Sequence, residues 1–373
     1  MMAPAGRAPV SRQIRGRVMP LENFAIDDSL LEVAPAHVSD AQAGEVLHRH
    51  FGLSGTLEKL GGERDLNFRV LLPDGASRLL KLSHPLENPD VVDFHNQAMR
   101  CIALRDPALP VQRVHTSLAG EHFVRVEANG HRMLARLLSF VDGMQLHRVG
   151  RTTQTFRRSL GASLARLDVA LEGFDHPAAR HTLLWDMQHA AHLRPLLAHL
   201  EPGQGRALVE QSLDQFEARV VPTMAGLRRQ VIHNDMNPHN IIVDADNPDV
   251  LRNILDFGDM VHAPLINEVA VAASYHLGHD GDALAPALDV IAAYHQHNPL
   301  AHEELQLLPE LLRTRLASAL CINSWRAQLH PENRGYIHRN SQRAWANLAS
   351  IAALLRAEIE NRILAACSRE GRA

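Results

Sequence analysis

Hydrophobic and polar positions change their pattern about one third of the way along the chain. Between residues 55 and 138, short apolar runs alternate with turn residues, and GTLEKLGGERDLNFRVLLPDGASRLLKLS is typical of three short strands. The first turn contains Gly61 and Gly62, and the second contains Pro73-Asp74-Gly75, all residues that favour tight turns. The first third is therefore predicted to be rich in β-structure.

The rest of this β-rich part contains one helix and further strands. Asn88-Pro89-Asp90 is typical of a helix cap and first turn, which predicts a helix over residues 90–104. LPVQRVHTS predicts another strand, and EHFVRVEANGHRMLARLLSF predicts a hairpin, because Asn129-Gly130 favours a type I′ turn. Together these segments predict a five-stranded, mostly antiparallel sheet with one inserted helix.

After residue 143 the apolar positions follow a helical period. Residues 150–230 are predicted to be mainly helical, and VIHNDMNPHNIIVD and VLRNILDF follow them as short strands before further helices. Four further helices are predicted over residues 265–278, 283–296, 303–329 and 341–367. A β-rich part followed by a helical part indicates an α+β fold of two lobes with a cleft between them. We expect an N-terminal lobe over residues 29–140, a C-terminal lobe over 141–373 and a hinge at Val141–Gly143.

Composition narrows the class of protein and its partners. A formal net charge of −4 over 373 residues argues against nucleic acid or an acidic membrane surface as the main partner. Residues 1–28 form a basic leader that is predicted to be disordered, and a targeting role for it stays open. The chain has no apolar run long enough to cross a bilayer. Cys101, Cys321 and Cys367 are far apart, which favours reduced thiols and a cytoplasmic location.

Candidate chemistry is concentrated in the segment that begins at Val231. Its spacing is His233-x-Asp235-x-x-x-x-Asn240, and Asp256 follows within ILDFGD. Protein kinases use this pattern because a carboxylate must accept the proton of the attacking hydroxyl. An amide oxygen and a second carboxylate must hold Mg²⁺, which prefers hard oxygen ligands. The pattern predicts Asp235 as the base and Asn240 with Asp256 as metal ligands, facing each other across two short strands.

Other interpretations of the same residues remain possible. A polar hairpin loop could use its Asn and Asp side chains to satisfy its own backbone. A metal-dependent hydrolase could use His233, Asp235 and His239 as zinc or manganese ligands. An inactive nucleotide-binding regulator is a third alternative, against which the complete set of candidate residues argues.

Lysine is rare in this chain, and one of its two lysines lies where a phosphate-binding residue is needed. Lys81 follows two leucines in SRLLKLS, on the third predicted strand, whereas Lys59 is predicted to be exposed. The loop between the first two predicted strands, LGGERDLNF, contains Gly61, Gly62 and Asn67. Its place in the sequence predicts a loop that covers the nucleotide phosphates.

The chain from about residue 30 resembles the aminoglycoside phosphotransferase and choline kinase superfamily. The motifs that carry this resemblance are HNDMNPHNIIV, ILDFGD and LLKLS. GERDLNFRV, FGDMVHAPLINEVAVAASY and HPENRGYIHRNSQRAWANL are similar to the hydroxylysine kinase-like branch, which includes phosphotransferase domains fused to class III aminotransferases.

The resemblance implies a protein-kinase-like fold, with a small antiparallel β N-lobe and a larger helical C-lobe. It implies that the enzyme transfers the γ-phosphoryl group of ATP or GTP, with Mg²⁺, to the hydroxyl of an amino alcohol or hydroxy amino acid. A hydroxylysine-like acceptor is the first expectation, and homoserine, choline, ethanolamine or an aminoglycoside are alternatives. The oligomeric state stays open.

The resemblance also assigns roles to individual residues. Asp235 would be the catalytic base, and Lys81 would bind the α- and β-phosphates. Asn240 and Asp256 would hold the metal, and Arg136 and Leu138 would lie along the pocket for the nucleotide base. His233 would support the loop, and Asp259 would face the substrate.

Two positions depart from the pattern of protein kinases. Their lysine is paired with a glutamate on the helix of the small lobe, but here that helix offers His95, Asn96 and Gln97. Asp93 or Glu87 could take the place of the glutamate, and the sequence does not decide between them. Asn234 stands where glycine is frequent, which is tolerable because asparagine accepts a positive φ.

The acceptor would need an anionic pocket for its ammonium group. Candidates for that pocket are Glu268, Asp280 and Asp282, with Trp325 and Trp345 as possible cation–π faces. Structural roles are the competing interpretation, because tryptophan is usually part of a core and Asp-Gly pairs usually form turns. For Glu268 we expect that it braces the catalytic loop.

Overall fold

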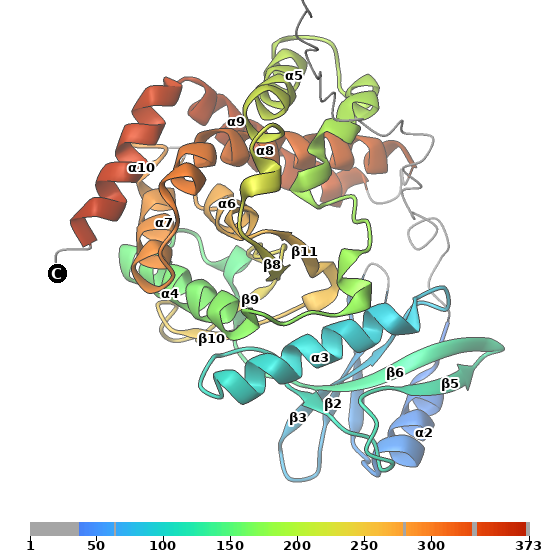
Figure 1. The fold of residues 1–373 in the computed structure, drawn as a ribbon. Coiled ribbons are helices and arrows are strands. Elements are labelled where there is room, and N and C mark those ends of the chain that lie inside the picture. Colours follow the sequence, from blue (N-terminus) through green and yellow to red (C-terminus); the bar gives the residue numbers. More distant parts are fainter. Residues whose placement is uncertain (1–36, 63–64, 279–280, 330–333, 371–373) are drawn as a thin grey trace, which may run out of the picture.

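The computed structural model describes residues 37–62, 65–278, 281–329 and 334–370. The predicted leader, residues 1–28, and the candidate Asp280 lie outside these described residues. Within them the chain forms a sheet-containing part and a larger helical part, with short strands where the two meet (Figure 1). The α+β, protein-kinase-like fold class is confirmed.

The N-terminal sheet has six strands, not the five that were predicted. Its strands are β1 (Thr56–Leu60), β2 (Leu66–Leu71), β3 (Ser77–Leu82), β4 (Val114–His115), β5 (Val124–Ala128) and β6 (His131–Ser139). All of the pairs are antiparallel. The count is six because both strands of the predicted hairpin, β5 and β6, and the two-residue strand β4 join the first three strands in one sheet.

The two helices of this part belong to different hydrophobic cores. α2 (Asp40–Phe51) buries its apolar side chains in a core with Phe68 and Leu80 of the sheet. α3 (Pro89–Arg105) crosses the sheet in Figure 1 and buries Phe94 and Met99 in the main core of the helical part. α3 therefore joins the sheet to the helices through shared apolar packing.

The described helical part carries short strands in two small sheets. Its helices are α4 (Gln154–Leu171), α5 (Gln204–Gln215), α6 (Ile266–Ser274), α7 (Ala285–His297), α8 (His302–Leu329), α9 (Arg334–Ala352) and α10 (Arg356–Glu370). Its strands are β7 (Met144–Gln145), β8 (Arg229–Ile232), β9 (Ile241–Val243), β10 (Leu251–Ile254) and β11 (Val261–Pro264). The strand order is β10-β9-β7 in one small sheet and β11-β8 in the other. Among the described residues, no helix is long and apolar enough to cross a lipid bilayer.

The helix predicted over residues 341–367 is two helices, α9 and α10. Neither glycine nor proline marks the break between them. The guanidinium of Arg313, on α8, donates to the carbonyls of Ile351 and Leu354 at 3.1 and 3.0 Å. Because the last carbonyls of a helix have no intrahelical partner, this contact from a distant helix stabilises the end of α9.

The connection between the two parts is tied down on both sides. On the sheet side, the Arg69 guanidinium of β2 donates to Asp142 at 2.6 Å and lies 4.9 Å from the centre of the Phe140 ring. On the helical side, a Cβ atom at Gly143 would lie 2.5 Å from the carbonyl oxygen of Val243. Only glycine lets the backbone approach β9 this closely.

The buried imidazole of His276 makes the stability of the fold depend on pH. His276 is 5% exposed and its Nε2 has no hydrogen-bond partner among the described residues. Burial lowers the pKa of this histidine to about 3. The unfolded chain would bind a proton here below its ordinary pKa of about 6.5, while the folded protein would not.

We expect the His276→Gln variant to lose less stability than the wild type as the pH falls. Below about pH 6.5 this one imidazole lowers the free energy of unfolding by about 1.4 kcal/mol per pH unit. Thermal unfolding of both proteins at pH 8 and pH 5 measures the difference. The stability of the variant relative to the wild type should rise by about 2 kcal/mol between these two pH values. Parallel pH dependences of the two proteins would contradict this account.

Candidate functional site

The polar loop predicted from the sequence joins two short strands of different sheets. β8 ends at Ile232 and pairs with β11, while β9 begins at Ile241 and pairs with β10. The amide of Leu255 donates to the carbonyl of Asn240 at 2.7 Å, one residue before Asp256. The end of the polar loop and the start of the Asp256 segment therefore lie side by side, as the sequence pattern predicts.

A buried carboxylate below the loop fixes its conformation. Glu268 of α6 is 0% exposed, and its Oε2 accepts the backbone N–H of Asn234 at 2.8 Å. Asn234 has a φ of 65°, and its side-chain amide donates to the carbonyl of Asp259 at 3.2 Å. Burial raises the pKa of Glu268, while the neighbouring His233 and the hydrogen bonds from the loop amides oppose that rise. Glu268 thus braces the loop, as we expected from the sequence.

His233 also supports the loop from within. One ring nitrogen lies 2.9 Å from the carbonyl oxygen of Leu255, and the other accepts the backbone N–H of Asp235 at 3.3 Å. The ring packs edge-on against Phe257, with 4.9 Å between the ring centres. Both nitrogens of His233 are engaged in holding the loop.

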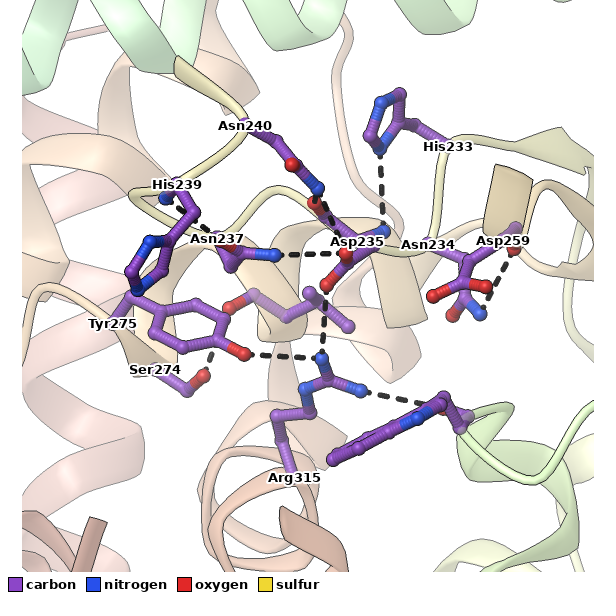
Figure 2. Close-up of polar contacts among 12 residues, drawn as sticks. His233, Asn234, Asp235, Asn237, His239, Asn240, Asp259, Ser274, Tyr275 and Arg315 are labelled. Atoms are coloured by element: carbon purple, nitrogen blue, oxygen red, sulfur yellow. Dashed lines mark hydrogen bonds and ion pairs between the residues drawn. The ribbon is translucent and has the colours of Figure 1, made fainter. Parts of the chain in front are cut away.

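Asp235 lies at the centre of the site, and its two carboxylate oxygens have different partners. Oδ2 accepts the side-chain amides of Asn237 and Asn240, both at 2.8 Å. Oδ1 faces the guanidinium of Arg315 at 3.4 Å, as Figure 2 shows. Burial and the charge of Asp259 raise the pKa of Asp235 to about 7, against the opposing charge of Arg315.

Lys81 links the sheet to the Asp256 segment. Its Nζ lies 2.9 Å from Asp65 Oδ2 and 3.6 Å from Asp256 Oδ1. Burial alone would lower the pKa of Lys81, but the charges of Asp256 and Asp65 outweigh burial and raise it. Asp256 adopts a φ of 54°, and its Oδ1 also accepts the N–H of Gly258 at 3.3 Å. This carboxylate is half exposed.

The acidic partner of Lys81 comes from the loop between β1 and β2, not from α3. Both candidates named from the sequence are engaged elsewhere. Asp93 accepts the Gln97 amide at 2.6 Å and lies 3.4 Å from His176, while Glu87 accepts the N–H of Asn88. The sequence did not indicate Asp65 because protein kinases carry the acidic partner of this lysine on the helix of the small lobe, and Asp65 lies in a loop.

The loop between β1 and β2 is tightly folded around Asn67. The Asn67 amide lies 3.5 Å from the carbonyl oxygen of Gly61 and 3.3 Å from that of Asp65. A Cβ atom at Gly62 would lie 2.5 Å from the Asn67 amide nitrogen, so the loop requires glycine there. Asn67 pairs with Lys81 across the strands, which places this loop beside the lysine.

The residues predicted to line the pocket for the nucleotide base lie on β6. Arg136 is the cross-strand neighbour of Lys81 and is buried. Leu138 is buried in the middle of the sheet, between Leu79 of β3 and Val114 of β4. Arg136 is thus adjacent to the lysine, and Leu138 lies farther along the same strand.

The structure adds Arg315, which the sequence reasoning missed. Its side chain is 3% exposed and lies on α8, 80 residues from Asp235 in the chain. It also donates to the Tyr275 hydroxyl at 3.1 Å and to the carbonyl of Trp185 at 3.3 Å. A charged residue within the apolar run of α8 is itself a signal, since arginine is rarely buried unless it is paired. The sequence does not say which residue is its partner.

The ligands of the alternative hydrolase site do not come together. His239 stacks on His147 with 4.0 Å between the ring centres, whereas His233 is occupied by loop contacts. Within the described part of the chain, no three His, Cys, Asp or Glu side chains are grouped to hold a metal ion.

The candidates for an ammonium pocket have structural contacts instead. Asp282 pairs with Arg362 and accepts the first N–H groups of α7. Trp325 and Trp345 are partly buried against the main core. Asp282, Trp325 and Trp345 therefore have structural roles of the kind expected as the alternative to an ammonium pocket. Asp259 lies near Asp235, because its backbone carbonyl accepts the side-chain amide of Asn234.

Comparison with known proteins gives relatives over most of the chain. Residues 56–308 match the family described as "Phosphotransferase enzyme family". Hydroxylysine kinase of Mus musculus is 25% identical over 337 residues, which cover 84% of this chain and 89% of the relative. The enzyme of the same name from Danio rerio is 25% identical over 339 residues, covering 87% and 95%.

Solved structures share the fold at low sequence identity. A microcompartment-associated aminopropanol kinase has a TM-score of 0.66 at 19% identity and covers 84% of this chain and 97% of its own. An amicoumacin kinase, in complex with AMP-PNP, Ca²⁺ and Ami, has a TM-score of 0.61 at 15% identity, with coverages of 90% and 96%.

We expect Asp65 and Lys81 to be strongly coupled in a double-mutant cycle. Breaking a largely buried ion pair leaves an uncompensated charge, so the coupling energy between Asp65→Asn and Lys81→Met should be about 2 kcal/mol. Denaturant unfolding of the two single variants and the double variant measures this energy. As the matched control, Asp93→Asn should couple to Lys81→Met by less than about 0.5 kcal/mol. The reverse order of the two coupling energies would overturn the pairing.

Proposed function

The chain belongs to the phosphotransferase enzyme family and is a small-molecule kinase with an alcohol acceptor, and we propose that it phosphorylates an amino alcohol or hydroxy amino acid. ATP or GTP would donate the γ-phosphoryl group, and a hydroxylysine-like compound is the first candidate acceptor. The observation that carries the proposal is that three segments meet: the polar loop with Asp235 and Asn240, the Asp256 segment and the strand of Lys81. Asn240 contacts Asp235 directly and accepts the amide of Leu255, the residue before Asp256, and Lys81 pairs with Asp256.

Asn240 and Asp256 have the chemistry to hold Mg²⁺. The Asn240 amide nitrogen is used by Asp235, which leaves its carbonyl oxygen as the atom that can bind a metal. The Asp256 carboxylate is 51% exposed and lies one residue beyond the backbone contact with Asn240. Oxygen ligands of this kind are those that Mg²⁺ prefers. When bound, the ion would neutralise charge on the nucleotide phosphates.

The catalytic contribution of the chain would be positioning and charge neutralisation. Lys81 would turn from Asp65 and Asp256 toward the α- and β-phosphates. The acceptor oxygen would form a bond to the γ-phosphorus, while the bond to the leaving diphosphate breaks and the acceptor proton passes to Asp235 Oδ1. Oδ2 already accepts from two amides, whereas Oδ1 has one longer contact with Arg315, so Oδ1 is the oxygen with room to accept the substrate proton. Such fixed geometry can supply much of the rate enhancement.

The names of related kinases and the negative charge of Asp259 support the proposed class of acceptor. Relatives of this chain are named hydroxylysine kinase, and a structural neighbour is named aminopropanol kinase. Both names describe an alcohol that also carries an amine. Asp259 lies close enough to Asp235 to influence its pKa and would supply negative charge for an ammonium group.

We assign the lobes and the location on the same basis. Residues 29–140 would be the nucleotide-binding lobe, and residues 141–373 would be the catalytic and substrate lobe. Cys101, Cys321 and Cys367 are free thiols, which supports a cytoplasmic location.

We expect Asp235→Asn to lower kcat by about 10³-fold or more, since the amide cannot take the acceptor proton. The fold and the affinity for nucleotide should be retained, because the two neighbouring amides lie on the loop itself. Release of nucleoside diphosphate in the presence of acceptor measures kcat, and calorimetry with Mg-ATP measures nucleotide binding. As the matched control, His239→Gln should keep kcat within about threefold, since this ring stacks on His147 and lies outside the proton path. Unchanged turnover in Asp235→Asn would rule out the mechanism.

A panel of acceptors should separate the substrate classes. We expect kcat/KM to be at least about 10²-fold higher for hydroxylysine than for its deoxy counterpart lysine, because lysine has no hydroxyl to phosphorylate. Homoserine, 1-amino-2-propanol, ethanolamine, choline and kanamycin complete the panel, each with ATP and with GTP. Phosphorylated product is identified by mass spectrometry. If none of these alcohols is phosphorylated, the proposed acceptor class is wrong.

A further inference from the structure

Arg315 is a buried cation that directly contacts the proposed base. Its guanidinium lies 3.4 Å from Asp235 Oδ1, and the side chain is 3% exposed. Burying a charge is costly unless the charge is paired and hydrogen-bonded. A cation in this place therefore requires partners that remain in position whether or not substrate is bound.

The protein supplies those partners around the guanidinium. One terminal nitrogen donates to the hydroxyl of Tyr275 at 3.1 Å, and the other donates to the carbonyl of Trp185 at 3.3 Å. The guanidinium carbon lies 5.1 Å from the centre of the Trp185 ring and 5.8 Å from that of Tyr275. Figure 2 shows Arg315 reaching from its helix toward Asp235 and Tyr275. Hydrogen bonds and cation–π contacts thus fix the orientation of the guanidinium plane.

The contacts of Asp235 show what this fixed guanidinium can do. Oδ2 is held at 2.8 Å by each of two amides that belong to its own loop, Asn237 and Asn240. Oδ1 has the longer contact, 3.4 Å, with Arg315. The two contacts of Oδ2 do not stop the carboxylate from rotating about that oxygen. The third contact, from Arg315 to Oδ1, restricts this rotation.

We propose that Arg315 is a positioning residue for phosphoryl transfer, which holds Oδ1 of Asp235 in the direction of the acceptor hydroxyl. This inference rests on the proposed function, in which Oδ1 accepts the acceptor proton. Arg315 contacts neither the nucleotide site at Lys81 nor the acceptor itself in this account. Its effect is therefore on the rate of the chemical step rather than on the binding of either substrate.

A matched arginine on the same helix separates positioning from stabilisation of the fold. Arg313 lies two residues earlier on α8 and donates to the carbonyls of Ile351 and Leu354, at the end of α9. It has the same side chain and a comparable structural role, but it makes its contacts away from Asp235. Arg313→Met should lower thermal stability and leave kcat within about threefold.

The experiment compares Arg315→Met, Arg315→Lys and Arg313→Met with the wild type and with Asp235→Asn. We expect Arg315→Met to lower kcat by about 10²-fold, with the KM values for nucleotide and acceptor within about threefold of the wild type, since misplacing a reacting group by about 1 Å costs this much. Arg315→Lys should recover only part of the loss, because an ammonium cannot reproduce the planar fork. Methylguanidinium added to Arg315→Met should restore kcat by at least about fivefold, and the neutral methylurea should not.

Each outcome decides between the roles. Retention of kcat by a folded Arg315→Met overturns the inference. An increased KM for carboxylate-bearing acceptors alone, with unchanged kcat, also overturns it and makes Arg315 a residue that binds the acceptor. Should Arg315→Met fail to fold, Tyr275→Phe removes one support of the guanidinium, and an unchanged kcat in that variant overturns the inference. Failure of the proposed function is seen separately, as unchanged turnover in Asp235→Asn or absence of turnover in the wild type.

Discussion

A carboxylate without access to solvent determines the shape of the active loop. Glu268 is fully buried, and its Oε2 accepts a hydrogen bond from the loop above it. The donor is the backbone amide of Asn234, a residue with a φ of 65°. That one peptide orientation sets the direction in which Asp235 leaves the loop. Asp235, the next residue, contacts Asn240 and the buried Arg315 of α8.

Ion pairs of a largely buried lysine also join the two parts of the molecule. Lys81 is held between two acids, one from the loop after β1 and one from the segment after β10. The ion pairs connect sheet and helices at the place where the phosphates of a nucleotide would bind. Apolar packing of α3 against the main core connects them a second time. The geometry of the site is thus maintained by charge on one side of the sheet and by hydrophobic contact through α3.

What the sequence could predict depended on distance along the chain. Asn240 and Asp256 were placed together correctly, because they flank a hairpin whose strands are close in sequence and strongly apolar. Asp65 was missed although it lies in a segment already singled out, since its partnership follows from the path of a loop and not from spacing. Arg315 and Arg313 act across the fold, and one arginine among many gives no indication of its partner. The break between α9 and α10 was likewise unpredictable, because a side chain of another helix causes it.

The scarcity of lysine has a practical consequence for chemical modification. Lys59, on an exposed position of the edge strand β1, and Lys81, inside its ion pairs, are the only side-chain amines in the sequence. Amine-reactive dyes, cross-linkers and coated sensor surfaces would therefore attach almost entirely at Lys59 and at the α-amino group. The protein can be immobilised through one edge of its sheet with the amine of Lys81 still native. Acylation of the second lysine would then report directly on whether the site is open.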